Sequence, residues 1–231
     1  MGQRAHRPAG GSAASARVRW EPHDFPLRNA AEIVLRRALH ELGLSGIVHD
    51  VQVFVDLGDR DDRAYIEWRE NDHRVARLFF AVGNFVTPDR RRAWARTWGR
   101  RAGPPPLPAR HFSRRSFAEA SLHELLHLRD DHDSRVDFSG HPERDREGLN
   151  ELWNVWIDGR LERRGLPAMS RAERRRIYRR TLGGLPGFAA RWERVFRALW
   201  AADHLSPREL TASLEELKRG GRPAPRGRRS R

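Results

Sequence analysis

The sequence predicts an α+β fold, in which one helix and a small antiparallel or mixed sheet precede a series of helices. Three observations predict it: apolar residues at helical spacing over 29–42, three strand-like runs within 47–82, and repeated amphipathic helical segments from residue 114 onward. The chain has 231 residues. We expect a single domain over residues 20–219, flanked by disordered basic tails at 1–19 and 220–231.

The elements follow from local signals along the chain. Asn29 as a cap and Glu32 three residues later predict the start of the first helix, and Gly43 predicts its end. The strands are predicted at 47–57, 64–69 and 75–82, and we expect 75–82 to be the edge strand of the sheet. Residues 87–110 are expected to form a surface excursion with a short helix at about 89–99.

From residue 114 onward, most of the chain is predicted to be helical. One is expected at 114–130, a second at 149–163, and a strongly amphipathic one at 188–202. Ser170 followed by Glu173, and Ser206 followed by Glu209, predict the N-termini of two more helices by capping.

Residues 116–133 read SFAEASLHELLHLRDDHD and contain an H-E-x-x-H motif. Ser116 and Glu119 predict a capping box at the start of the helix that carries it. In a helix, His123 and His127 lie four residues apart on one face, where two imidazoles can bind one zinc ion. Glu124 then faces a zinc-activated water as general base.

A zinc ion bound by two histidines needs a further protein ligand and an open position. The chain has no cysteine, so this ligand must be His, Asp or Glu. Asp158 is the preferred candidate, because a carboxylate on the following helix needs no special turn. Four other residues stay open as alternatives: Glu151, Glu162, Asp133 and His132.

Two segments, HELLHLRDDHDSR and ELWNVWIDGRLERRGLP, together resemble the predicted metallopeptidase domain that precedes von Willebrand factor A-like modules in bacteria. The matched positions lie within 116–167: His123, Glu124, His127 and His132, then Leu152-Trp153-Asn154 with Asp158. The resemblance implies a zincin-like fold, with the H-E-x-x-H helix followed by a ligand-bearing helix. It also implies zinc-dependent peptide-bond hydrolysis.

The expected function is therefore that of a metalloendopeptidase acting on a peptide or protein substrate. Four residues are candidates for stabilising the oxyanion: Tyr178, His132, His141 and Arg160. Two other functions are kept as alternatives. One is a non-catalytic zinc-binding or partner-binding protein, and the other is a DNA-associated protease of the SprT-like sort, recruited by its basic segments.

The net charge of +14 is concentrated in the tails, which contain nine arginines and no acid and leave +5 for residues 20–219. Such tails can contact nucleic acid non-specifically, but no recognition motif accompanies them. No apolar run is long enough to predict a membrane helix or a signal peptide. The absence of cysteine is typical of a reducing compartment, so we expect a cytoplasmic protein.

Overall fold

The computed structural model describes residues 16–58, 64–69, 72–97, 107–133, 136, 138 and 140–219. Four strands form one sheet in the order β1-β2-β4-β3: β1 (Arg17–Glu21), β2 (Asp50–Asp56), β3 (Ala64–Arg69) and β4 (Asp72–Ala81). β2 pairs in parallel with both β1 and β4, whereas β3 pairs with β4 in the antiparallel sense. The predicted α+β class with a small mixed sheet is confirmed.

β1 lies partly within the stretch that was predicted to be a disordered tail. Its sequence alternates, and Val18 and Trp20 are buried while Arg17, Arg19 and Glu21 point outward. The tail prediction for 1–19 is therefore wrong at its inner end, because the period-two pattern of a strand is already present there. Residues 1–15 and 220–231, which make up the rest of the two predicted tails, lie outside the described residues.

The prediction of 75–82 as the edge strand is also wrong. β4 lies between β2 and β3, and its residues Ala76, Leu78 and Phe80 are buried in the core. Among the described strands, β1 and β3 form the two edges of the sheet. Tyr65 of β3 is 52% exposed, as is common for a side chain on an edge strand.

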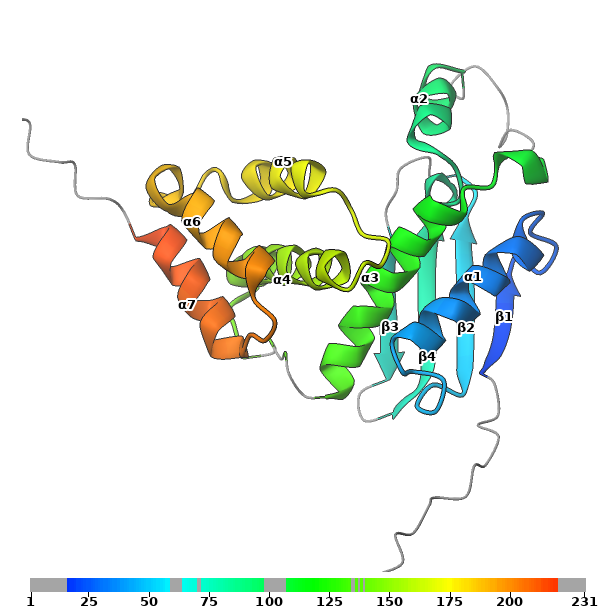
Figure 1. Cartoon of the computed structure of the whole chain (residues 1–231), viewed down its shortest axis with the longest axis horizontal. Helices are drawn as coiled ribbons and strands as arrows, with labels where there is room; N and C mark the ends of the chain where they lie inside the picture. The colour runs from blue at the N-terminus through cyan, green and yellow to red at the C-terminus, as the bar shows by residue number, and fades with distance from the viewer. Residues whose placement is uncertain are drawn as a thin grey trace, which may run out of the picture.

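Two helices, α1 (Arg28–Glu41) and α3 (Arg114–His132), lie on the same face of the sheet (Figure 1). α1 begins one residue before the predicted cap Asn29, and Gly43 ends it with a φ of 66°. α3 is capped by Ser113, whose side chain accepts a hydrogen bond from the Ser116 backbone N–H. The predicted cap at Ser116 is therefore wrong by three residues.

The connection between the sheet and α3 contains a short helix, as predicted. α2 (Pro88–Thr97) follows the 3₁₀ turn η1 (Val82–Phe85), and a second turn, η3 (Ala109–His111), precedes α3. Residues 98–106 lie outside the described residues. Phe85 and Phe117 stack with their centroids 4.6 Å apart, which anchors the start of α3 to the core.

The C-terminal helices are α4 (Glu143–Arg163), α5 (Arg171–Leu182), α6 (Phe188–Ala201) and α7 (Pro207–Lys218). The predicted caps are confirmed, because Ser170 accepts from the Glu173 N–H and Ser206 forms a complete capping box with Glu209. α4 packs against α3 and against each of the other three helices, beside the β3 edge of the sheet (Figure 1). No helix in the described part of the chain is long and apolar enough to span a membrane.

Candidate active site

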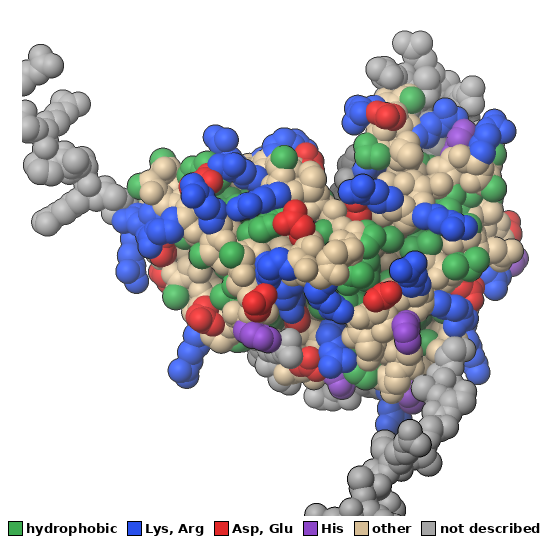
Figure 2. Space-filling view, viewed as in Figure 1, with side chains coloured by type: hydrophobic (Ala, Val, Ile, Leu, Met, Phe, Trp, Pro, Cys, Tyr) green, Lys and Arg blue, Asp and Glu red, His purple; other side chains and the backbone are tan. Residues whose placement is uncertain are grey.

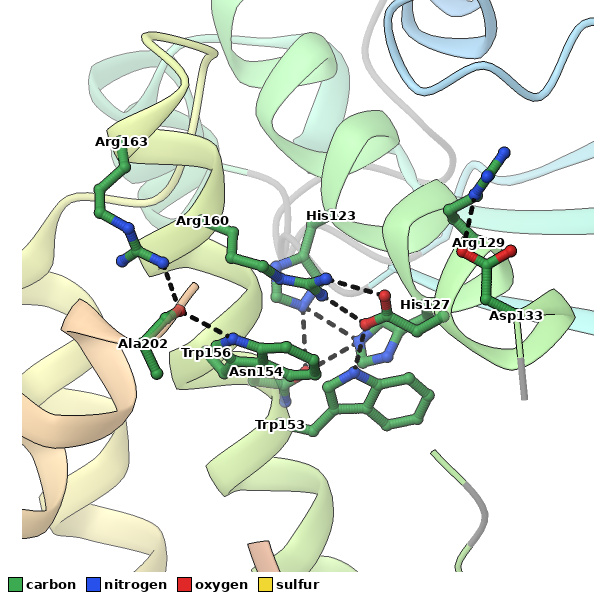
Figure 3. Close-up of polar contacts among 11 residues, drawn as sticks. His123, His127, Arg129, Asp133, Trp153, Asn154, Trp156, Arg160, Arg163 and Ala202 are labelled. Atoms are coloured by element: carbon green, nitrogen blue, oxygen red, sulfur yellow. Dashed lines mark hydrogen bonds and ion pairs between the residues drawn. The ribbon is translucent and has the colours of Figure 1, made fainter. Parts of the chain in front are cut away.

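The two histidines of the motif converge with one side chain from α4. On α3, the Nε2 atoms of His123 and His127 lie 3.3 Å apart. Asn154 of α4 places its Oδ1 atom 3.0 Å from each of them. Figure 3 shows the two imidazoles and the carboxamide directed at one another. Three potential donor atoms therefore surround one point between α3 and α4.

Asp158 lies on the other side of the His123 ring. Its Oδ1 is 2.9 Å from Nδ1 of His123, and its Oδ2 accepts a hydrogen bond of 2.6 Å from Nε of Arg174. Both carboxylate oxygens of Asp158 thus have partners away from the point where the two Nε2 atoms meet. The prediction of Asp158 as the third metal ligand does not fit this geometry.

Among the alternative ligands, Glu151 is buried with its Oε2 atom 3.6 Å from Nη1 of Arg174, and two others are hydrogen-bonded elsewhere. Glu162 accepts a hydrogen bond from the Trp200 indole at 2.7 Å, and Asp133 accepts one from Arg129 at 3.1 Å. His132 is the last residue of α3. Within the described ranges, no group of three or more His, Cys, Asp or Glu side chains is arranged to hold a metal ion. A metal at this point would need Asn154 or an exogenous ligand besides the two histidines.

Burial and charge act in opposite directions on the two histidines. Burial alone would lower the pKa of His123, but the Asp158 carboxylate outweighs it and the pKa is raised. Burial and the neighbouring charge of His123 hold the pKa of His127 well below its ordinary value. His127 is therefore neutral at physiological pH, which is the form that can bind a metal.

Three carboxylates and one guanidinium are buried together beside this point. Burial raises the pKa of Glu124, although the charges of His123 and Arg174 oppose it. Burial also raises the pKa of Glu151, against the charge of Arg174 and a hydrogen bond from Asn154. For Asp158 the partners outweigh burial, so the pKa of this carboxyl is lowered. The lowered pKa favours the ionised form of Asp158, whereas the raised pKa values favour the neutral forms of Glu124 and Glu151.

A second set of buried side chains holds His127 in position. The Trp153 ring meets the His127 ring edge to face at 4.2 Å, and the Trp153 indole N–H donates to Asp130 at 2.9 Å. Arg160 donates to both oxygens of Asp130, and its guanidinium lies 3.7 Å from the centre of the Trp156 ring. Figure 3 shows Arg160, Trp156 and Trp153 beside the two histidines. The positions of His127 and Trp153 are therefore set by a buried ion pair.

A pocket of about 450 Å³ opens onto the histidines. His123, Glu124, His127 and Asn154 line it, and Ala64–Ile66 of the edge strand β3 form another wall. Arg180 of α5 also lines it. Figure 2 shows Lys and Arg side chains over α5 and on the α2 side of the hollow between these two helices.

None of the four expected oxyanion-stabilising residues lines this pocket. Tyr178 is fully buried against Phe188 and Phe196, and its hydroxyl has no hydrogen-bond partner. Arg160 is bound to Asp130. His141 packs against Phe138, and His132 is at the end of α3.

The sequence did not indicate that two further side chains, those of Asn154 and Arg174, belong to the site. Asn154 was noted only as part of the L-W-N-x-x-x-D pattern, and its side of α4 is the one that carries Asp158. Arg174 gave no signal, because it is one of several arginines in α5 and only the packing of α5 on α4 buries it.

Comparison with known proteins adds no assignment to this geometry. A scan against models of protein families, a search of curated proteins and a search of solved structures each found no match.

Proposed function

We propose that this protein is a zinc-dependent peptidase whose metal is held by His123 and His127 and whose general base is Glu124. The observation that carries the proposal is the 3.3 Å separation of the two Nε2 atoms at the pocket wall. Two nitrogens about 2.05 Å from a tetrahedral zinc ion lie about 3.3–3.4 Å apart. The histidine pair therefore fits zinc without any movement of α3.

Charge balance also supports a divalent cation at this point. Three buried acids, Glu124, Glu151 and Asp158, lie beside one buried guanidinium, that of Arg174. Burial raises the pKa of Glu124 and of Glu151, because their ionised forms lack full compensation. A divalent cation between the histidines would favour these ionised forms.

The residues around the histidines have distinct roles in this proposal. When bound, zinc polarises the scissile carbonyl and makes a water molecule more acidic. Glu124 accepts a proton from that water and delivers it to the leaving amine. The raised pKa of Glu124 suits a group that must both accept and release a proton. Burial of Glu124 also limits competing bulk water around the carboxylate.

The substrate would bind along β3. Ala64, Tyr65 and Ile66 line the pocket, and β3 is an edge of the sheet, so its outer main-chain groups face no described strand. An extended peptide can pair with such an edge by β-augmentation, which places a peptide carbonyl near the histidines.

The test is to measure zinc content and peptidase activity together on the full chain. Zinc would be quantified by mass spectrometry, and cleavage would be followed with an unfolded protein and a mixture of quenched fluorescent peptides. We expect one zinc per wild-type chain. Glu124→Gln is expected to keep the zinc and lose at least about 100-fold in kcat/KM, which is the usual scale of general base catalysis.

Glu119→Gln is the matched control, because Glu119 lines the same pocket from the same helix but is paired with Arg115. It should retain wild-type activity. A wild-type chain without zinc after refilling would refute the metal proposal. Stoichiometric zinc with no cleavage of any substrate would favour the non-catalytic alternative. Activity that depends on added DNA would favour the DNA-associated one.

A further inference from the structure

The carboxamide of Asn154 occupies the position where a third ligand would be needed. We infer that Asn154 binds the metal through Oδ1, and that Asp158 is a positioning residue that orients His123. This inference rests on the proposed function, because it assigns the ligands of the same metal site.

The hydrogen bonds around His123 fix which of its nitrogens is free. Asp158 is ionised and bonded to Arg174, so it can only accept a hydrogen bond from Nδ1 of His123. Nδ1 of His123 therefore carries a hydrogen, and Nε2 is the nitrogen left to bind a metal. Nε2 lies 3.0 Å from the Asn154 Oδ1 atom.

The amide oxygen of Asn154 is the atom that faces His123 and His127. Its distance of 3.0 Å from each Nε2 atom is slightly shorter than the about 3.3 Å expected between two ligands of a tetrahedral ion. A small rotation of the carboxamide accommodates the difference.

The contacts of Asp158 are those of a residue that supports a metal-binding histidine without touching the metal. Metal-binding histidines commonly donate their second N–H to a carboxylate, which fixes the ring and makes the ligand more basic. Asp158 does this for His123, and Arg174 of α5 holds the carboxylate in place. The fully buried position of Asp158 also keeps its charge close to the metal site without direct contact.

A set of two imidazoles and one amide is electrically neutral. It leaves the full charge of the metal to act on water, but it binds a divalent cation less tightly than a set with a carboxylate. Replacing the amide by a carboxylate of the same shape should therefore tighten zinc binding. This consequence distinguishes a ligand at 154 from a residue that only packs there.

The experiment measures zinc affinity by competition with a chromophoric chelator. Asn154→Ala is expected to weaken binding at least 100-fold, and Asn154→Asp to tighten it about tenfold. Asp158→Asn is expected to weaken binding about 10- to 100-fold while still binding one zinc, as outer-sphere substitutions do. Asn150→Ala is the control, since Asn150 lines the same pocket from the same helix, and it should leave the affinity unchanged.

Cobalt substitution gives a readout that a purely structural role would not move. The visible absorption of cobalt depends on its ligand set and geometry. We expect the spectrum to change in Asn154→Asp and to keep its band pattern in Asp158→Asn. Circular dichroism identifies any variant that fails to fold. If Asn154→Ala fails, Asn154→Asp tests the inference, because aspartate has nearly the same size as asparagine.

The inference would be overturned if Asn154→Asp bound zinc with unchanged or lower affinity. It would also be overturned if Asp158→Asn lost its zinc while Asn154→Ala retained one zinc per chain. Both results leave the proposed peptidase standing, because the wild type still binds zinc. A wild-type chain that binds no zinc would overturn the inference and the proposed function together.

Discussion

Gly159 is the position where the packing of the C-terminal helices can be tested most directly. It lies on α4, where α4 crosses α6. A Cβ atom at this position would lie 2.3 Å from the Trp200 carbonyl oxygen and 2.9 Å from the Trp200 carbonyl carbon. Contacts between carbon and oxygen usually fall at about 3.3–3.6 Å. Gly159→Ala therefore requires the two helices to separate by about 1 Å.

The expected cost can be worked from these contacts. Overpacking a core costs about 1–3 kcal/mol, and the upper end applies here because the obstacle is backbone rather than a flexible side chain. Alanine recovers about 1 kcal/mol of helix propensity relative to glycine. The free energy of unfolding should thus fall by about 2 kcal/mol in Gly159→Ala.

Two other glycines provide a graded comparison. At Gly148, also on α4, the added Cβ meets Leu214 Cδ1 at 2.8 Å, and this methyl group can rotate away. The gain in helix propensity should then leave Gly148→Ala within about 1 kcal/mol of wild type. Gly184 has nothing within 4 Å of the added carbon and serves as the control.

The assay is urea denaturation of the three variants beside wild type, analysed with a common slope. Zinc affinity is the second readout, because Asp158 immediately precedes Gly159 and its bond to His123 is 2.9 Å long. A displaced α4 would lengthen this bond and weaken zinc binding. A Gly159→Ala protein as stable as Gly184→Ala would refute the close contact between α4 and α6.

Three further predictions concern buried polar groups. Burial raises the pKa of Glu124, so the ionised carboxylate opposes folding when no metal is bound. In the presence of a chelator, Glu124→Gln should therefore raise the melting temperature more at about pH 8 than near pH 5. An equal rise at both pH values would contradict this. Trp153→Phe should cost about 1–3 kcal/mol in urea denaturation, because Asp130 loses a buried donor; a neutral result would mean that the hydrogen bond is dispensable. Tyr178→Phe should raise stability by up to about 1 kcal/mol, since it removes a buried hydroxyl without a partner; a loss of stability would show that the hydroxyl is bonded.

The sequence predicts the helices of this fold better than its sheet. Capping residues such as Ser170 and Ser206 act over three residues, so the local sequence contains the whole signal. The pairing of β2 with β4 in parallel, which leaves β3 at the edge, depends on contacts between distant segments. β1 has a clear alternating pattern but only five residues, and the flanking arginines resemble a tail.

The same distinction applies to the site. The spacing of His123 and His127 is a property of one helix, and the structure brings their Nε2 atoms together as that spacing predicts. Asn154 and Asp158 lie one turn apart on α4, so both face α3. Which of them meets the Nε2 side of His123 depends on how far α4 is shifted along α3. A shift of one turn exchanges their roles, and no residue spacing within α4 specifies it.

The position of α4 along α3 is in turn set by contacts outside the site. Gly159 allows α4 to touch the α6 backbone, and the Trp156 indole donates to the Ala202 carbonyl at 3.0 Å. From α5, Arg174 binds Asp158, and so α5 is linked to His123 through one carboxylate. The C-terminal helices therefore determine which α4 side chain faces the histidines. Loosening their packing should change metal affinity before it changes the H-E-x-x-H helix, because α3 is held independently by the sheet and by α1.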